Sequence, residues 1–220
     1  MCVSRGEATR SSSGAEQVSS APTVFVVDDE DGFRASLARL LRSAGLPVRD
    51  FASPAEFLSE YDASAPGCLV LDFAMPGLDG VELQRILTDE LDCDLPVVFL
   101  TGRAEVPDSV KALKQGALEF LTKPAEPEVL LDAVRDALAR NEECRRESAE
   151  LAELRKRMAE LTPREREVFE HVVTGQRNKQ IARDLGTAEK TIRIHRGQVM
   201  KKMQADSVAT LVRMAERLDI

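Results

Sequence analysis

Five side chains that could bind a metal ion and transfer a phosphoryl group stand at the ends of short apolar runs. They are Asp28 and Asp29 after the first run, Asp72 after the third, Thr101 after the fourth and Lys123 after the fifth. Clustered carboxylates repel one another unless a cation is present, and an all-oxygen ligand set favours a hard ion such as Mg²⁺. An Asp carboxylate beside Mg²⁺ can accept a phosphoryl group, whose charge an ammonium complements. These residue types predict aspartyl phosphorylation, although a single Asp after a strand is more often a cap or turn residue.

The apolar runs are spaced like the strands of a parallel sheet. They cover residues 23–29, 47–51, 67–72, 96–101 and 118–123. Three of them are continuous apolar stretches, which are typical of strands buried on both faces. Helical patterns alternate with them, near 33–41, 53–56, 81–87, 110–117 and 129–138. The alternation predicts an α/β fold with a five-stranded, doubly wound parallel sheet of the flavodoxin-like type. Ligands bind at the carboxyl ends of such strands, where the five polar side chains stand.

The charge of the chain is divided between two blocks of opposite sign. The 220 residues include 30 Lys and Arg against 38 Asp and Glu, a formal net charge of −8. Residues 21–125 hold nine basic and eighteen acidic residues, whereas residues 161–220 hold twelve basic and eight acidic ones. The net charge therefore does not exclude nucleic acid as a partner of the second block.

Composition predicts four segments. Residues 1–20 lack periodicity and are predicted to be a disordered tail, followed by the α/β domain at 21–138, a helical linker at 139–160 and an all-helical domain at 161–220. The linker contains no Gly or Pro, and both a solvated connector and a dimerising coiled coil fit its sparse apolar seam. The four cysteines lie outside any C-x-x-C pattern, and neither a signal peptide nor a membrane-spanning run is present. We expect a cytoplasmic protein with reduced thiols and no membrane partner.

The last sixty residues have the pattern of a four-helix, helix-turn-helix domain. A capping box at 162–165 begins it, and we expect helices at 163–174, 178–185, 188–203 and 207–218. On the third helix one stripe holds Ile192, Arg196, Val199 and Met203. The opposite face holds Lys190, Arg193, Ile194, Gly197 and Lys201. Such a face suits a DNA major groove, where basic side chains meet guanines or phosphates and an Ile meets a thymine methyl. An ordinary charged surface helix is the alternative.

Four separated motifs resemble the receiver domain of two-component response regulators: VVDDE at 26–30, LDFAMPGLDG at 71–80, FLTG at 99–102 and EFLTKP at 119–124. A further motif, TGRAEVP at 101–107, resembles the FixJ-like branch. The resemblance implies that Asp72 is the phosphoacceptor and that Thr101 and Lys123 contact the phosphoryl group. It also implies that Phe120 is the switch aromatic and that the Lys123–Pro124 peptide is cis.

The resemblance further implies which groups bind Mg²⁺: the carboxylates of Asp28, Asp29 and Asp72 and the backbone carbonyl of Ala74. Because Ala74 has no polar side chain that could orient an attacking water, we expect slow loss of the phosphoryl group.

The second block resembles the LuxR/NarL-type helix-turn-helix. Its recurrent features are T-P-R-E-x-E-V at 162–168, N-K-x-I-A at 178–182 and K-T-I-x-x-H-R at 190–196. The DNA-binding residues that we expect, mostly by position in this family, are Lys190, Arg193, Ile194, Arg196, Gly197 and Lys201, with Arg177 and Lys179 at the DNA backbone. Gly197 departs from the larger polar residue of many relatives, which removes one contact and adds about 1 kcal/mol of helix cost.

Together the two resemblances imply a response regulator that is not an enzyme beyond its own phosphorylation and dephosphorylation. A sensor histidine kinase would phosphorylate it, and the face at about 107–123 would then form a homodimer. The dimer would bind an inverted repeat in double-stranded DNA and act on RNA polymerase. Three alternatives remain: a haloacid-dehalogenase-like phosphatase, which normally needs a second Asp where Ala74 stands, a protein-binding adaptor, and a LuxR-type sensor of a small molecule.

Overall fold

A computed structural model describes residues 21–91, 93, 95–102 and 119–220 of the chain. The chain divides into two compact units, with the division between Asn141 and Glu142. The helix expected at 110–117, the tail at 1–20 and most of the TGRAEVP motif lie outside the described residues. None of the described helices combines the length and the apolar character that a membrane-spanning segment requires.

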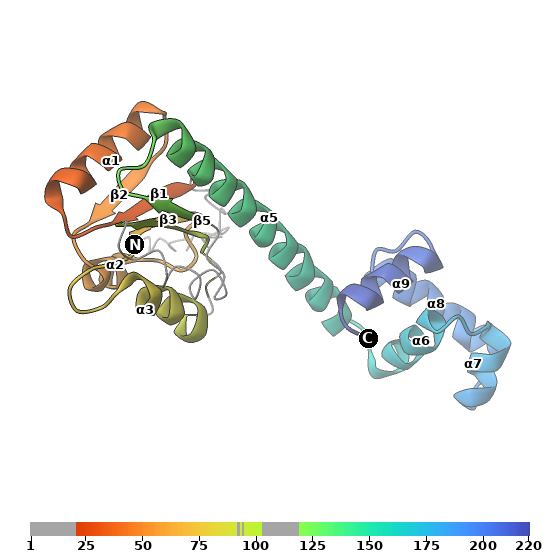
Figure 1. Cartoon of the computed structure of the whole chain (residues 1–220). Helices are drawn as coiled ribbons and strands as arrows, with labels where there is room; N and C mark the ends of the chain where they lie inside the picture. Colours follow the sequence, from red (N-terminus) through yellow and green to blue (C-terminus); the bar gives the residue numbers. More distant parts are fainter. Residues whose placement is uncertain (1–20, 92, 94, 103–118) are drawn as a thin grey trace, which may run out of the picture. The chain divides into compact units, whose positions relative to one another are not determined.

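The first unit is built on a five-stranded parallel sheet (Figure 1). Its strands are β1 (Thr23–Val27), β2 (Val48–Phe51), β3 (Gly67–Asp72), β4 (Val97–Thr101) and β5 (Glu119–Thr122). Their order is β2-β1-β3-β4-β5, and every neighbouring pair is parallel. This is the flavodoxin-like order, in which the chain reverses its winding between β1 and β3, so the predicted fold class is confirmed.

Helices cover both faces of this sheet, as Figure 1 shows. On one face α1 (Asp31–Ser43) and the first part of α5 (Pro127–Ala159) pack against alternate strand residues such as Val26 and Val70. On the other face α2 (Pro54–Glu60) and α3 (Gly80–Arg85) pack against residues such as Phe25 and Leu71. The helix expected at 81–87 ends differently, because α3 continues into a π-helical turn, η1 (Ile86–Glu90). Both faces of the sheet are therefore buried, which explains the continuous apolar runs.

Helix α5 is a single helix of 33 residues that includes both the helix expected at 129–138 and the expected linker at 139–160. Its first part buries Leu130, Val134 and Ala137 against the sheet. The buried Asn141 ends this part, and its Oδ1 accepts a hydrogen bond of 3.0 Å from the backbone N–H of Gly67. All side chains from 142 to 150 are exposed except the half-buried Cys144. This stretch is a solvated helix in the chain as described.

The second unit is all-helical. Its helices α6 (Pro163–Val173), α7 (Asn178–Asp184), α8 (Glu189–Lys202) and α9 (Val208–Arg217) end within one residue of their predicted bounds. Thr162 forms the predicted reciprocal capping box with Glu165 at the start of α6. At the start of α2, the Ser53 hydroxyl accepts from the N–H of Glu56, and the Glu56 carboxylate accepts from the N–H of Ala52 rather than from that of Ser53. A core of residues such as Phe169, Ile181, Ile192 and Leu211 joins the four helices.

Candidate functional site

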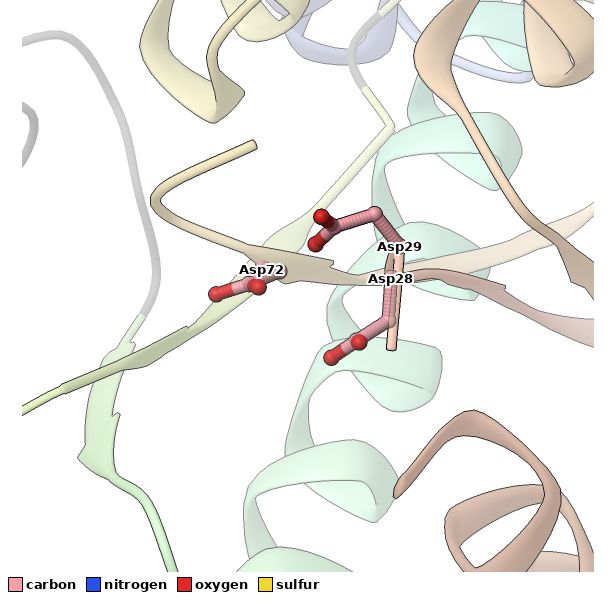
Figure 2. A group of neighbouring side chains, drawn as sticks. All are labelled: Asp28, Asp29 and Asp72. Atoms are coloured by element: carbon pink, nitrogen blue, oxygen red, sulfur yellow. The ribbon is translucent and has the colours of Figure 1, made fainter. Parts of the chain in front are cut away.

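The three predicted carboxylates meet at the carboxyl ends of β1 and β3 (Figure 2). Val27 is paired with Leu71 in the sheet, so Asp28 and Asp72, which follow them, lie side by side. Asp29 is exposed next to them, and oxygen atoms from the three carboxylates lie within 4.8 Å of one another. This place is the point between β1 and β3 where the winding of the sheet reverses, as expected for a ligand site.

Lys123 bridges the two buried carboxylates. Its Nζ lies 2.7 Å from Oδ2 of Asp28 and 2.8 Å from Oδ2 of Asp72. The Asp28 side chain is fully buried, and those of Asp72 and Lys123 are 9% and 18% exposed. The ring of Phe33, from the first turn of α1, lies 4.6 Å from the same ammonium and provides a cation–π contact. One cation, held on several sides, therefore offsets part of the repulsion between two carboxylates.

Burial and charge act in opposite directions on these groups. Desolvation raises the pKa of Asp72 above its ordinary value, although the hydrogen bond and the charge of Lys123 oppose the shift and the charge of Asp28 adds to it. Desolvation would lower the pKa of Lys123, but its bonds to Asp28 and Asp72 outweigh this and raise it. The lysine is therefore held charged, and the Asp72 carboxylate is kept in an environment that favours a bound cation.

The donor set fits a hard divalent cation. Every candidate ligand is an oxygen, and Mg²⁺ usually binds one or two carboxylates and keeps several waters. The exposed Asp29 and Ala74 both line a pocket that also includes Phe73, Met75, Pro76 and Asp79. An ion near Asp29 would therefore be accessible to solvent and to the backbone of residue 74. Asp28 has less freedom, because its Oδ1 already accepts a bond of 2.9 Å from the N–H of Glu30.

Thr101 and Phe120 lie on the neighbouring strands. Thr101 is the last residue of β4, next to β3, and is 2% exposed with its hydroxyl donating to the carbonyl of Gly102 at 3.2 Å. The Phe120 ring stacks on Phe99 at 4.8 Å between centroids, with Phe73 edge-on at 6.0 Å. The structure thus places the phenyl ring of residue 120 inward, against the core. The Lys123–Pro124 peptide is cis, as the resemblance implied.

Two aromatic residues of this site are absent from the sequence-based set. Phe33 contacts Lys123, and Phe73 packs against the rings of Phe99 and Phe120. The signal for Phe73 was its position directly after Asp72, and that for Phe33 was its position four residues after Asp29. Neither position indicates which side chain the ring contacts, because the contacted residues come from β4, β5 and the segment after β5.

Helix α8 of the second unit has the two predicted faces. Ile192, Val199 and Met203 are fully buried in the core. The expected DNA-facing residues Lys190, Arg193, Ile194, Gly197 and Lys201 are all exposed, Ile194 by 57%. A Cβ added to Gly197 would meet no atom within 4 Å, so this position is an open gap on the outer face. A single exposed apolar side chain is common on protein surfaces, so the basic residues around Ile194 are what makes this face suit a DNA groove.

The remaining expected DNA-binding residues divide into two groups. Arg177 and Lys179, at the start of α7, are exposed. Arg196 is half-buried instead, and its Nη1 donates a hydrogen bond of 2.9 Å to Oδ1 of Asn178. The structure therefore turns Arg196 toward α7, away from the outer face of α8.

Comparisons with known proteins match both units. Residues 24–135 match the family model of the response regulator receiver domain, and residues 159–215 match the bacterial regulatory proteins of the luxR family. Nodulation protein W of Bradyrhizobium diazoefficiens is 43% identical over 211 residues, which are 96% of this chain and 92% of that protein. Transcriptional regulatory protein FixJ of Azorhizobium caulinodans is 44% identical over 195 residues, 87% of this chain and 90% of that one. The structure of response regulator StyR, 43% identical, gives a TM-score of 0.81 over 90% of this chain and 100% of that one.

Proposed function

The chain belongs to the two-component response regulators, with a receiver domain followed by a LuxR-family DNA-binding domain, and we propose that Asp72 is its phosphoacceptor. The family makes it a regulator of transcription rather than an enzyme, with a histidine kinase and DNA as its partners. The observation that carries the proposal is the buried pair Asp28 and Asp72, bridged by Lys123 beside the exposed Asp29. Asp28 shares the burial, the contact with Lys123 and the strand-end position, but it is fully buried and its Oδ1 already accepts a hydrogen bond from the N–H of Glu30, whereas the Asp72 side chain is 9% exposed.

The proposed transfer needs a nucleophile, a cation and an open path. A carboxylate oxygen of Asp72 forms the new P–O bond while the P–N bond to the phosphohistidine of the kinase breaks, and the histidine nitrogen takes the electron pair. Mg²⁺, held by Asp28, Asp29, Asp72 and the carbonyl of Ala74, would neutralise charge on the phosphoryl oxygens. Lys123 already lies 2.8 Å from Asp72 and would pair with the new anion. Phe33 keeps this ammonium in place.

Phosphorylation would be read out on the strands next to Asp72. The Thr101 hydroxyl would move toward the phosphoryl group, and Phe120 would change its packing against Phe99. We infer that the face at about 107–123 then forms a homodimer, as family behaviour implies. Most of this face lies outside the described residues, so the support comes from Phe120 and its neighbours on β5.

The DNA-binding unit would contact DNA through the outer face of α8 and the start of α7. We propose direct contacts from Lys190, Arg193, Ile194 and Lys201, backbone contacts from Arg177 and Lys179, and close approach at Gly197. A symmetric dimer would place two α8 helices on an inverted repeat and present the DNA-bound regulator to RNA polymerase in the cytoplasm. The exposure of these side chains on α8 and at the start of α7 supports this arrangement.

The phosphatase alternative is less well supported by the residues. Ala74, which lines the pocket beside Asp29, offers no acid that could protonate a leaving group. Turnover of a phosphate ester by the purified protein would favour the phosphatase instead.

The decisive experiment for the receiver incubates the full chain with acetyl phosphate and Mg²⁺ and measures its intact mass. Wild type should gain the mass of one phosphoryl group, and Asp72→Asn should not. Asp79→Asn is the matched control, because this exposed carboxylate caps α3 in the same region and should leave phosphorylation intact. An adduct that persists in Asp72→Asn would disprove the assignment.

A second experiment tests the DNA-binding face. The salt dependence of binding to one duplex is compared for wild type, Arg193→Ala and Arg213→Ala. Loss of one cation that contacts the phosphate backbone lowers the slope against salt by about 1. Arg193→Ala should weaken binding. If Arg193 contacts a phosphate, it should also lower the slope against salt by this amount. We expect neither from Arg213→Ala, which alters an exposed arginine on α9. Equal behaviour of the two variants would contradict the proposed face.

A further inference from the structure

Helix α7, the first helix of the helix-turn-helix, is held at one end by α6 and at the other by α8. At its end, the carbonyl of Leu185 accepts a hydrogen bond of 2.6 Å from Nη2 of Arg164 in α6. At its start, Oδ1 of Asn178 accepts a hydrogen bond of 2.9 Å from Nη1 of Arg196 in α8. Helix α7 has only seven residues, and a helix of two turns has little stability of its own. These side-chain bonds therefore help to fix its position.

The position of Arg196 on α8 explains why its side chain reaches Asn178 and not the outer face of the helix. It lies one turn after the fully buried Ile192 and three residues before the fully buried Val199, on the stripe that faces the core. Its alkyl stem can cover this apolar surface while the guanidinium reaches the edge of the helix pair. Both Arg196 and Asn178 are half-buried, so the bond between them is partly shielded from water. The outer face, with Lys190, Arg193 and Lys201, lies on the other side of the helix.

We propose that Arg196 is a positioning residue for DNA recognition. Through Asn178 it fixes the angle at which α8 is presented to the groove, and it does not itself contact a base or a phosphate. The inference rests on the proposed role of α8 as the recognition helix. It assigns Arg196 a different role from its basic neighbours, although residue type grouped all of them together.

We call the hydrogen bond between Arg196 and Asn178 the brace. A double-mutant cycle with Arg196→Met and Asn178→Ala tests it. The probe is the duplex that phosphorylated wild type enriches from a randomised library, with dissociation constants measured over a range of salt concentrations. Each single variant should weaken binding about tenfold, because each removes the same partly buried, charge-assisted bond. The double variant should bind no more weakly than either single variant, because the two residues act as a unit. The slope against salt should stay that of wild type.

Lys201→Met is the matched control, since it removes an exposed cation from the same helix. It should lower the salt slope by about 1, and its effect should add to that of Asn178→Ala. The inference is overturned if Arg196→Met lowers the slope in the same way while Asn178→Ala binds like wild type. Such a result would make Arg196 a phosphate contact. Wild-type binding by both single variants would also overturn it.

Two further measurements test the inference even if Arg196→Met does not fold or if the proposed function is wrong. Asn178→Ala leaves every core side chain in place, so its binding decides the question if Arg196→Met does not fold. If wild type enriches no duplex, the proposed function fails, and the brace is then measured in the free protein. Both variants should speed amide hydrogen exchange in α7 by a similar factor, about tenfold. Unchanged exchange would overturn the brace.

Discussion

The two units of this response regulator use charge in opposite ways. In the receiver, Asp28, Asp72 and Lys123 come from distant parts of the sequence and are largely shielded from water, with one positive charge between two negative ones. In the DNA-binding unit, Lys190, Arg193 and Lys201 lie on a single helix and are exposed. Buried charges are strongly coupled, so a change in one alters the others, whereas exposed charges act nearly independently. The first arrangement suits a switch and the second suits a surface for a polyanion.

The largest effect should come from removing the buried cation. Lys123→Met leaves Asp28 and Asp72 facing each other without a counter-ion, which should lower the free energy of unfolding of the receiver by about 3–5 kcal/mol. Tyr61 is the only tyrosine and the chain has no tryptophan, so tyrosine fluorescence during urea unfolding reports this unit alone.

Arg42→Met is the matched control for Lys123→Met, because it removes the cation of an exposed ion pair. Arg42 lies 2.7 Å from Asp50, but the two side chains are 52% and 34% exposed, so the loss should stay below about 1 kcal/mol. Similar losses for the two variants would remove the contrast between buried and exposed charge. Added Mg²⁺ should restore part of the stability of Lys123→Met, because it replaces the missing positive charge between the carboxylates.

A smaller effect is expected where α5 leaves the receiver. Asn141→Leu keeps the volume of the buried side chain but leaves the N–H of Gly67 without its acceptor, which should cost about 1–3 kcal/mol. The control, Glu142→Gln, alters the next residue, which is exposed, and should change nothing measurable. Tyrosine fluorescence during urea unfolding measures both. A large effect of Glu142→Gln would mean that the solvated part of α5 also stabilises the receiver.

Most of the receiver site was predictable from sequence because strand ends in a parallel sheet meet at one edge. Continuous apolar runs located β1, β3 and β4, and their parallel arrangement brings Asp28, Asp72 and Thr101 to the same edge. The start of the DNA-binding unit followed from the capping box at 162–165, which is a local sequence signal. These are local or topological properties, which short segments of sequence carry.

The unpredicted contacts join side chains across the fold. The cation–π contact of Phe33 with Lys123, the stack of Phe120 on Phe99 and the bond from Arg196 to Asn178 depend on how elements pack. Periodicity placed Arg196 on the inner stripe, but residue type grouped it with the DNA-facing basic residues. The role proposed for Arg196 rests on the partner that its side chain reaches rather than on its charge.

The DNA-binding unit also contains a charge pair whose carboxylate is buried, so the contrast between buried charges in the receiver and exposed charges in this unit is not complete. Glu165 is 7% exposed, and its Oε2 accepts bonds of 2.6 Å from Lys202 and 2.8 Å from the N–H of Thr162. The bond from Lys202, followed by that from Thr162, lowers the pKa of Glu165 below its ordinary value of 4.5. Its ionised form therefore stabilises the unit above that pH, and the contribution is lost as the pH falls through the lower pKa of the folded protein.

Glu165→Gln should accordingly destabilise this unit by about 1 kcal/mol at neutral pH and by less in acid. Amide hydrogen exchange in α6 of the full chain measures the effect at each pH. Glu167→Gln, on the same helix but exposed, serves as the control and should show no such dependence. A difference in stability between wild type and Glu165→Gln that grows as the pH falls would contradict the lowered pKa of Glu165.

The smallest expected effect is kinetic and concerns an exposed position of the receiver. Hydrolysis of the phosphoryl group requires a water oxygen to attack phosphorus while the bond to Asp72 breaks, and Ala74 offers no group that orients this water. Ala74→Gln should speed the loss of phosphate about fivefold, which corresponds to about 1 kcal/mol of barrier. Ala74→Leu has a similar size without a polar group and should leave the rate unchanged. Both variants retain the backbone carbonyl, so Mg²⁺ affinity should not change.

Intact mass followed over time after removal of acetyl phosphate measures this rate. Equal acceleration by Gln and Leu would show that the side chain acts by bulk and not by orienting water, and loss within seconds in wild type would contradict the slow reaction itself. Because Ala74 is exposed and lines the pocket beside Asp29, its substitution should change the lifetime of the signal without affecting the buried charges that create it. Within the receiver itself, buried residues would then set whether the switch works and an exposed one how long it stays on.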